Sequence, residues 1–280
     1  MNAPDAPEMR EAPSGATGAA FDLPGGPDAV LLLHGLTGSP FEMRHLAERL
    51  HHRGMRCRGP VMPGHGGDPR ALAGLAWPVW VEGARRELAS LGRARRTFVV
   101  GCSMGALVAC ALAHALPDRV DGLALLAPAL KLSGGARLAG LLALHTPLGG
   151  LLPPVPKLGG SDVRDRDMRR DNPTMPAVPL QAVGELIDLA RHVDALLPGI
   201  AAPALIVAGR HDHTVKLSGA RRLARRIGSG PAKLVVLERS FHLVGIDVER
   251  DRCADEVASF FEKIPGLRRG GAQGDAWQDT

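Results

Sequence analysis

A serine between two glycines lies where a predicted strand meets a predicted helix. The run Gly101-Cys102-Ser103-Met104-Gly105 follows an apolar segment, residues 97–100, and opens another that continues to residue 116. A strand that turns directly into a helix strains the backbone at the turn, and the flanking glycines avoid steric overlap there. The pattern therefore predicts a nucleophile elbow, with Ser103 as the nucleophile and the N–H of Met104 as an oxyanion donor.

A serine hydroxyl needs a base within reach, and that base needs a group to orient it. In an open parallel sheet, reactive side chains gather just after the strands, at their carboxyl ends. Asp212 and His242 each follow an apolar run, residues 204–207 and 233–237, by five residues. The order Ser, Asp, His is a known order for such a triad. We therefore predict His242 as the base and Asp212 as the acid that orients it.

Several neighbouring residues compete for these roles. Asp247 follows His242 by five residues and is the alternative acid, although we expect it to cap the next helix. His211 and His213 form a His-x-His pair, which is weak evidence for zinc without further ligands of suitable spacing. We therefore expect no metal and no organic cofactor. Cys102 is expected to be a small packing residue.

A second oxyanion donor is expected from the loop after the first buried run. That loop reads His34-Gly35-Leu36-Thr37-Gly38. A glycine lets the chain turn sharply, which leaves the amide of Leu36 free to point inward. His34, at the end of the run, is expected to anchor the loop and not to act as a second base.

Five short apolar runs alternate with segments of helical periodicity. Runs that are apolar on both faces are typical of buried parallel strands, so the alternation predicts an α/β fold with helices on both faces of a mostly parallel sheet. The predicted strands are 29–33, 97–100, 122–126, 204–207 and 233–237. The predicted helices are 42–53, 79–92, 104–116, 217–227 and 253–263.

About 75 residues separate the third and fourth of these strands, far more than a usual crossover. Residues 136–144 and 179–197 have helical spacing, so we expect a helical cap, at about 128–178 and after a sixth strand, that lies over the site. The surrounding single domain is placed at 21–265, between flexible tails at 1–20 and 266–280. The cap leucines indicate an apolar acyl pocket: Leu138, Leu141, Leu142, Leu144, Leu148, Leu151 and Leu152.

Composition limits the other classes of function. The chain has 280 residues, 45% hydrophobic and 22% charged, as in ordinary globular proteins. Its net charge of +5 comes from interleaved bases and acids, Tyr is absent, and Phe and Trp total nine, so we expect no nucleic-acid partner. No apolar stretch reaches the roughly 18 residues that span a bilayer, and no secretory signal opens the chain, so we expect no stable membrane insertion and a cytoplasmic location. The four cysteines form no CxxC pair and are expected to be free thiols.

Together these runs resemble the α/β-hydrolase fold, and more narrowly the small bacterial carboxylesterases and bacterial monoacylglycerol lipases. The resemblance covers roughly residues 28–264 and is carried by residues 32–38 (LLHGLTG), 63–66 (PGHG), 101–105 (GCSMG), 209–212 (GRHD) and 240–242 (SFH). Members of that group carry an aromatic residue where this chain has Leu36. Because the backbone amide is the donor, the change is expected to alter the acyl pocket and not to abolish activity.

The resemblance implies a serine carboxylesterase that hydrolyses carboxylic esters with an apolar acyl group through an acyl-enzyme; the expected partner is a small-molecule ester. Ser103 would be the nucleophile, His242 the base and Asp212 its acid, and Leu36 and Met104 the oxyanion donors. A monoacylglycerol lipase is the close alternative. A thioesterase, an acyltransferase or a carbon–carbon bond hydrolase on the same scaffold comes next. A non-catalytic binding module ranks last, because all three triad residues are present. The oligomeric state is left open.

Overall fold

The structure, a computed structural model, describes residues 18–134, 154–157 and 159–265. Most of both predicted tails, the predicted helix 136–144 and all seven cap leucines lie outside these residues. No helix in the described part is long and apolar enough to cross a membrane.

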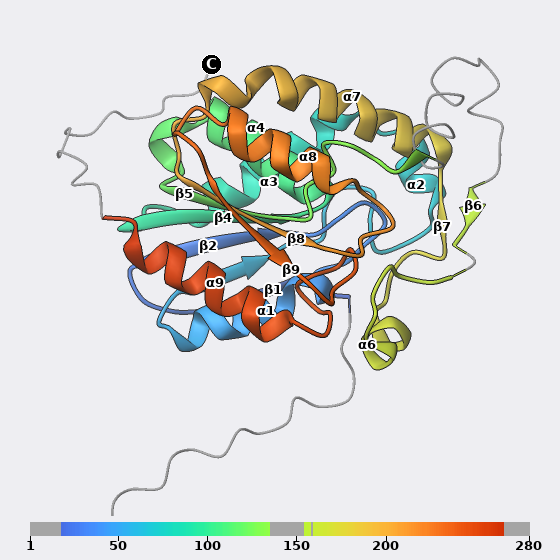
Figure 1. Ribbon diagram of the computed structural model, residues 1–280, viewed down its shortest axis with the longest axis horizontal. Helices are drawn as coiled ribbons and strands as arrows, with labels where there is room; N and C mark the ends of the chain where they lie inside the picture. The colour runs from blue at the N-terminus through green and yellow to red at the C-terminus, as the bar shows by residue number, and fades with distance from the viewer. Residues whose placement is uncertain (1–17, 135–153, 158, 266–280) are drawn as a thin grey trace, which may run out of the picture.

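A seven-stranded sheet forms the centre of the molecule (Figure 1). Its strands lie in the order β1-β3-β2-β4-β5-β8-β9, and every neighbouring pair is parallel except β1 with β3. The bounds are β1 Phe21–Leu23, β2 Asp28–Leu33, β3 Arg56–Gly59, β4 Arg96–Cys102, β5 Gly122–Leu126, β8 Ala204–Gly209 and β9 Lys233–Leu237.

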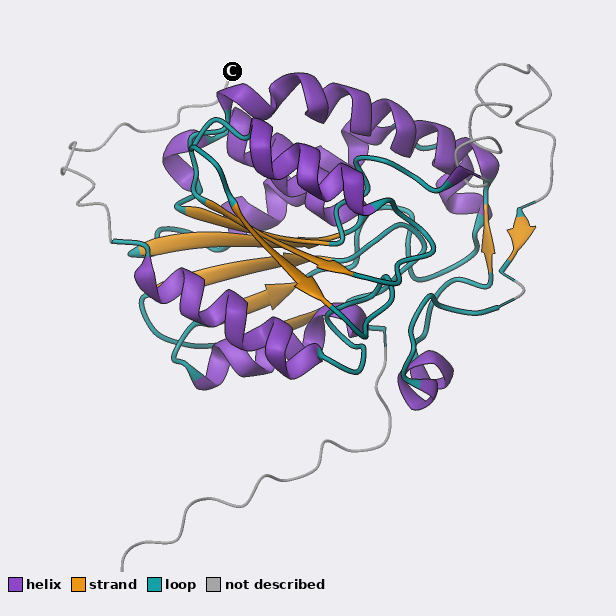
Figure 2. Cartoon of the chain, in the orientation of Figure 1, coloured by secondary structure: helices purple, strands orange, loops and turns teal. Residues whose placement is uncertain are grey.

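Helices cover both faces of this sheet (Figure 2). Side chains alternate across a strand, so Leu31 and Leu33 of β2 pack into one apolar core and Val30 and Leu32 into the other. The first core includes residues of α3 (Trp77–Ser90), α4 (Met104–Ala115), α7 (Leu180–Leu196) and α8 (Leu217–Arg226). The second includes residues of α1 (Phe41–His52) and α9 (Arg250–Lys263). The predicted fold class is therefore confirmed.

The sequence did not predict β1 and β3. β3 reads Arg56-Cys57-Arg58-Gly59, and only its second and fourth residues are buried. It therefore lacks the continuous apolar run of the central strands. β1 has three residues, too few to show a period. All five predicted strands are present, with ends that shift by two residues at most.

The long insertion follows β5, the fifth strand along the chain, and the expected position after a sixth strand is wrong. The expectation assumed one more strand before the insertion than residues 18–134 contain. Within the insertion, β6 (Val155–Pro156) pairs with β7 (Ala177–Val178) as an antiparallel ribbon. A short helix, α6 (Arg166–Asp171), is capped by the side chain of Asp165. The short helices outside it are α2 (Arg70–Ala73) and the 3₁₀ turns Pro117–Arg119 and Leu197–Gly199.

Candidate active site

Ser103 occupies a strained turn between β4 and α4. Its φ is 55° and its ψ is −110°, a conformation that side-chain-bearing residues rarely adopt. A Cβ at Gly101 would overlap the backbone of Gly105, and a Cβ at Gly105 would overlap the carbonyl of Leu33. The turn is therefore closely packed on both sides, and glycine is needed at both positions.

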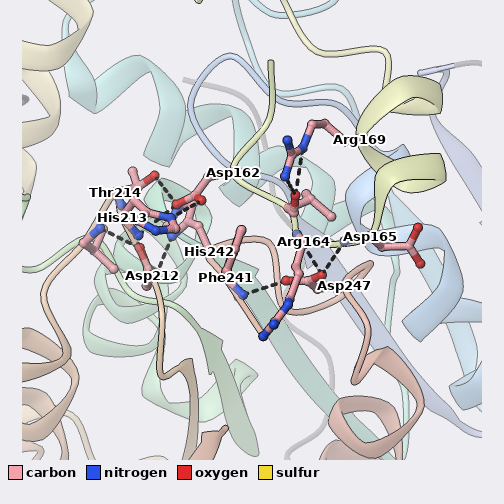
Figure 3. A network of polar contacts seen from close by, with 12 residues as sticks. Asp162, Arg164, Asp165, Arg169, Asp212, His213, Thr214, Phe241, His242 and Asp247 are labelled. Atoms are coloured by element: carbon pink, nitrogen blue, oxygen red, sulfur yellow. Dashed lines mark hydrogen bonds and ion pairs between the residues drawn. The ribbon is translucent and has the colours of Figure 1, made fainter. Parts of the chain in front are cut away.

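Asp212 and His242 meet at the carboxyl ends of β8 and β9 (Figure 3). Asp212 Oδ2 lies 2.8 Å from His242 Nδ1, and both side chains are buried. Asp212 Oδ1 accepts the N–H groups of Thr214 and Val215 at 2.8 and 2.7 Å, which fixes the carboxylate in place. A carboxylate at Nδ1 favours the tautomer that carries its proton there, and Nε2 is then free to accept a proton.

Burial and nearby charges act in opposite directions on His242. Burial by itself lowers the pKa of the imidazole, but the charge and hydrogen bond of Asp212 raise it, with further contributions from Asp162 and Glu42. The net direction is upward from 6.5. In the described part of the chain no hydrogen bond joins Ser103 to His242, although both line one cavity. Such contacts often tighten only when substrate binds.

The loop after β2 leaves its central amide unpaired. Within the described residues, neither the N–H of Leu36 nor that of Met104, the first residue of α4, donates to a protein acceptor. Thr37 follows with a φ of 61°. The Nε2 of His34 accepts the N–H of Met62 at 3.0 Å, and burial lowers the pKa of His34 to about 3. His34 is thus a neutral anchor for the loop, as predicted.

Two ionisable groups at this site, one buried and one partly buried, were not predicted from the sequence. Glu42 of α1 accepts the N–H of Gly35 at 3.3 Å, and burial raises the pKa of its carboxyl group. Lys157 donates to the Thr174 hydroxyl at 2.6 Å, and burial lowers the pKa of its amine. Neither forms an ion pair with a described side chain. An acidic residue beside apolar Phe41 at the start of a helix was the available signal for Glu42.

The competing residues have other roles. Asp247 does not cap α9, whose N-cap position belongs to Glu249, so that expectation is wrong. Its fully buried carboxylate instead accepts backbone N–H groups, among them that of Phe241 at 2.6 Å.

His213 is largely exposed and pairs with Asp162, and the described residues contain no cluster suited to a metal ion. Burial raises the pKa of the Cys102 thiol well above its usual value.

The proposed nucleophile and base line one cavity of about 390 Å³. It contains Ser103 and His242, together with the loop residues Gly35, Leu36 and Thr37. One set of lining residues is apolar: Leu132, Val155, Pro156, Val178, Leu180, Val183, Leu186 and Leu243. The other is polar: Glu42, Lys157, Ser161, Asp162, Thr174 and Thr214. The cavity can therefore hold a molecule with an apolar and a polar part.

Comparison with known proteins gives consistent relatives. The family model described as serine aminopeptidase, S33, matches residues 27–249. A thermostable monoacylglycerol lipase of Bacillus sp. (strain H-257) is 30% identical over 247 residues, which cover 88% of this chain and 95% of that protein. A carboxylesterase of Bacillus subtilis (strain 168) is 28% identical over 250 residues, covering 87% of this chain and 96% of that protein.

A solved structure from work on LipS and LipT, two metagenome-derived lipolytic enzymes, has a similar fold. It superposes with a TM-score of 0.79 at 28% identity, over 88% of this chain and 98% of that one.

Proposed function

The chain belongs to the serine aminopeptidase S33 family of α/β-hydrolases and is an ester-hydrolysing enzyme, and we propose that it cleaves carboxylic esters with an apolar acyl group through an acyl-enzyme. The observation that carries this proposal is the cavity that Ser103, His242 and Leu36 line together with an apolar wall. Within the described residues, the N–H of Leu36 donates to no backbone acceptor.

In the proposed reaction, Ser103 Oγ attacks the acyl carbon while His242 Nε2 takes its proton. The N–H groups of Leu36 and Met104 stabilise the resulting oxyanion. His242 then gives the proton to the leaving alcohol as the ester C–O bond breaks. In the second half, His242 takes a proton from the attacking water and gives it to Ser103 Oγ as the carboxylic acid leaves. Asp212 stabilises the imidazolium in both halves, and its 2.8 Å contact with His242 Nδ1 supports this role.

The test is turnover by Ser103→Ala. Hydrolysis of a nitrophenyl ester should fall by about 10⁴-fold or more, since the nucleophile is lost, while the melting temperature stays close to that of the wild type. Retention of near-wild-type turnover by the purified variant would overturn the proposal. A chain-length series of nitrophenyl esters, with acyl-CoA for comparison, then identifies the acyl preference.

The polar lining favours a second candidate, a monoacylglycerol lipase. Its leaving alcohol carries hydroxyl groups, which Glu42 can accept from and Lys157 can donate to. Both groups line the cavity without an ion-pair partner among the described side chains. The discriminating experiment compares kcat/KM for a monoacylglycerol and for the ethyl ester of the same fatty acid. A clear preference for the monoacylglycerol supports this candidate, and equal values favour a general carboxylesterase.

A further inference from the structure

A residue of the insertion bridges the two loops that carry the proposed acid and base. The carbonyl of Asp162 accepts the N–H groups of His242 and Leu243 at 3.1 and 3.2 Å. Its carboxylate accepts the N–H of His213 at 3.0 Å and the hydroxyl of Thr214 at 3.0 Å, and it lies 2.8 Å from the His213 ring nitrogen Nδ1 (Figure 3). One residue thus binds the loop after β8 with its side chain and the loop after β9 with its backbone.

These contacts close a ring through the catalytic pair. Thr214, held by the Asp162 carboxylate, donates its N–H to Asp212 Oδ1. Asp212 Oδ2 contacts His242, whose own N–H returns to the carbonyl of Asp162. A side chain held at both ends of such a ring has few rotamers available, so the distance between acid and base is fixed before substrate binds.

A second carboxylate fastens the insertion to the loop after β9. Asp247 Oδ1 accepts the N–H groups of Arg164 and Asp165 at 2.9 and 3.0 Å, and Oδ2 accepts that of Phe241 at 2.6 Å. The backbone around His242 is therefore bound to the insertion on two sides. This second attachment, close to Asp162 in the chain, does not involve the Asp162 carboxylate.

Charge gives Asp162 a second effect on His242. The acidic groups that act on the imidazole are Asp212 from the loop after β8, Asp162 from the insertion and Glu42 from α1. His213, which pairs with Asp162, is the nearest partner that could offset this charge, and its side chain is 66% exposed. The Asp162 carboxylate is one-fifth exposed, so its field is screened less than that of a surface charge.

We propose that Asp162 is a positioning residue for the reaction, which fixes the Asp212–His242 pair through the bonded ring and stabilises the imidazolium with its charge. The inference rests on the proposed function, in which His242 is protonated during each half of the reaction. It assigns the insertion a part in the chemistry in addition to covering the cavity.

The test compares Asp162→Asn with a matched control, Asp165→Asn. Both remove one charge from the insertion, but the side chain of Asp165 caps α6 and pairs with Arg250 and contacts neither loop. The pH dependence of kcat and kcat/KM is measured with a nitrophenyl ester, per active site titrated with a fluorophosphonate. Asp162→Asn should lower kcat about tenfold, leave KM nearly unchanged and move the acidic limb to lower pH by up to about one unit.

Asp162→Glu separates charge from geometry, since it keeps the carboxylate but displaces it. It should lower kcat and leave the acidic limb near its wild-type position. The inference is overturned if Asp162→Asn matches Asp165→Asn in kcat and pH profile, if it changes KM alone, or if it lowers only the melting temperature. Ser103→Ala distinguishes failure of the proposed function from failure of the role proposed for Asp162. Near-wild-type turnover by Ser103→Ala refutes the proposed function. An inactive Ser103→Ala together with an unaffected Asp162→Asn refutes the role of Asp162 alone.

Discussion

The amino-terminal and carboxyl-terminal edges of the sheet arrange their charged groups differently. At the amino-terminal edge, the buried Asp28 at the start of β2 receives both Arg95, at 2.6 and 2.9 Å, and Arg96, at 2.5 and 3.2 Å. At the carboxyl-terminal edge, Asp212 and His242 form a buried pair. The buried Glu42 and the partly buried Lys157 at that edge form no ion pair with a described side chain. The first arrangement stabilises the fold, and the second leaves groups available to a bound molecule.

Strained backbone conformations also differ between the two edges of the sheet. Among the described residues, three non-glycine residues have positive φ: Thr37, Ser103 and Ala127. They follow β2, β4 and β5, so all three lie at the carboxyl-terminal edge. Such conformations cost about 1–3 kcal/mol each and persist only where the surroundings impose them. Substitutions at the two edges should therefore affect different properties, activity at one and stability at the other.

The largest effect is expected for Asp212→Asn. The change keeps the shape of the side chain but removes the charge that stabilises the imidazolium and can select the wrong tautomer. In a serine protease, the same change at the aspartate of the triad lowers turnover by about 10⁴. We expect a loss of similar size here, mainly in kcat, with little change in melting temperature. The measurement is kcat across pH 5 to 9.

Asp247→Asn is the control for that experiment, since Asp247 is the nearest alternative acid. Its carboxylate accepts backbone N–H groups only, so its loss should lower the melting temperature more than kcat. If Asp247→Asn were inactive and Asp212→Asn active, the assignment of the acid would be wrong while Ser103 and His242 kept their roles.

Asp28→Asn should have the converse effect. Burial alone would raise the pKa of Asp28, but its bonds to Arg95 and Arg96 hold it at about 2, below the usual 3.8. A pKa lower in the folded state stabilises the protein above pH 4, and this stability is lost as the pH falls from about 4 to about 2. The loss in the variant should be about 2 kcal/mol at low salt near neutral pH, measured by urea unfolding, with kcat unchanged. A fall in kcat without loss of stability would contradict the division between the edges.

The pH profile of the wild type tests the electrostatics of the carboxyl-terminal edge. Because the pKa of His242 is raised from 6.5, the acidic limb of kcat/KM should have its midpoint above 6.5. Below that midpoint, activity should fall about tenfold per pH unit as the base becomes protonated. A midpoint below 6.5 would mean that burial outweighs the acidic neighbours.

A smaller effect is expected for Lys157→Met. It removes a partly buried donor while it keeps much of the apolar stem. If Lys157 binds a leaving-group hydroxyl, kcat/KM for a monoacylglycerol should fall about tenfold relative to the ethyl ester of the same acid. Lys131→Met, at an exposed lysine, is the control and should leave the ratio unchanged. If the ratio of kcat/KM for the monoacylglycerol to that for the ethyl ester were equal in the wild type, Lys157→Met and Lys131→Met, Lys157 would have no part in substrate recognition.

The sequence was informative where a short segment determines its own structure. The elbow around Ser103 needs only two glycines, a strand and a helix, and the positions of Asp212 and His242 follow from the strands before them. The central strands were predicted because both of their faces are buried. β3 was missed because it buries only alternate residues.

Residues brought together by the insertion could not be found in this way. Asp162 contacts a loop 51 residues further along the chain, and Thr174 contacts Thr37 across 137 residues. No local pattern marks such pairs, since they depend on the path of the insertion over the sheet. The misassigned role of Asp247 has the same origin, because its carboxylate lies two residues before the N-cap of α9 yet points toward the insertion.

Peptide mapping after covalent labelling tests whether Ser103 is the nucleophile that forms the acyl-enzyme. The wild-type enzyme is treated with a fluorophosphonate, digested and analysed by mass spectrometry, beside Ser103→Ala and Asp28→Asn. We expect one phosphonyl group per chain, on the peptide that contains Ser103, in the wild type and in Asp28→Asn, and none in Ser103→Ala. A phosphonyl group on another serine, or equal labelling and turnover in Ser103→Ala, would contradict it.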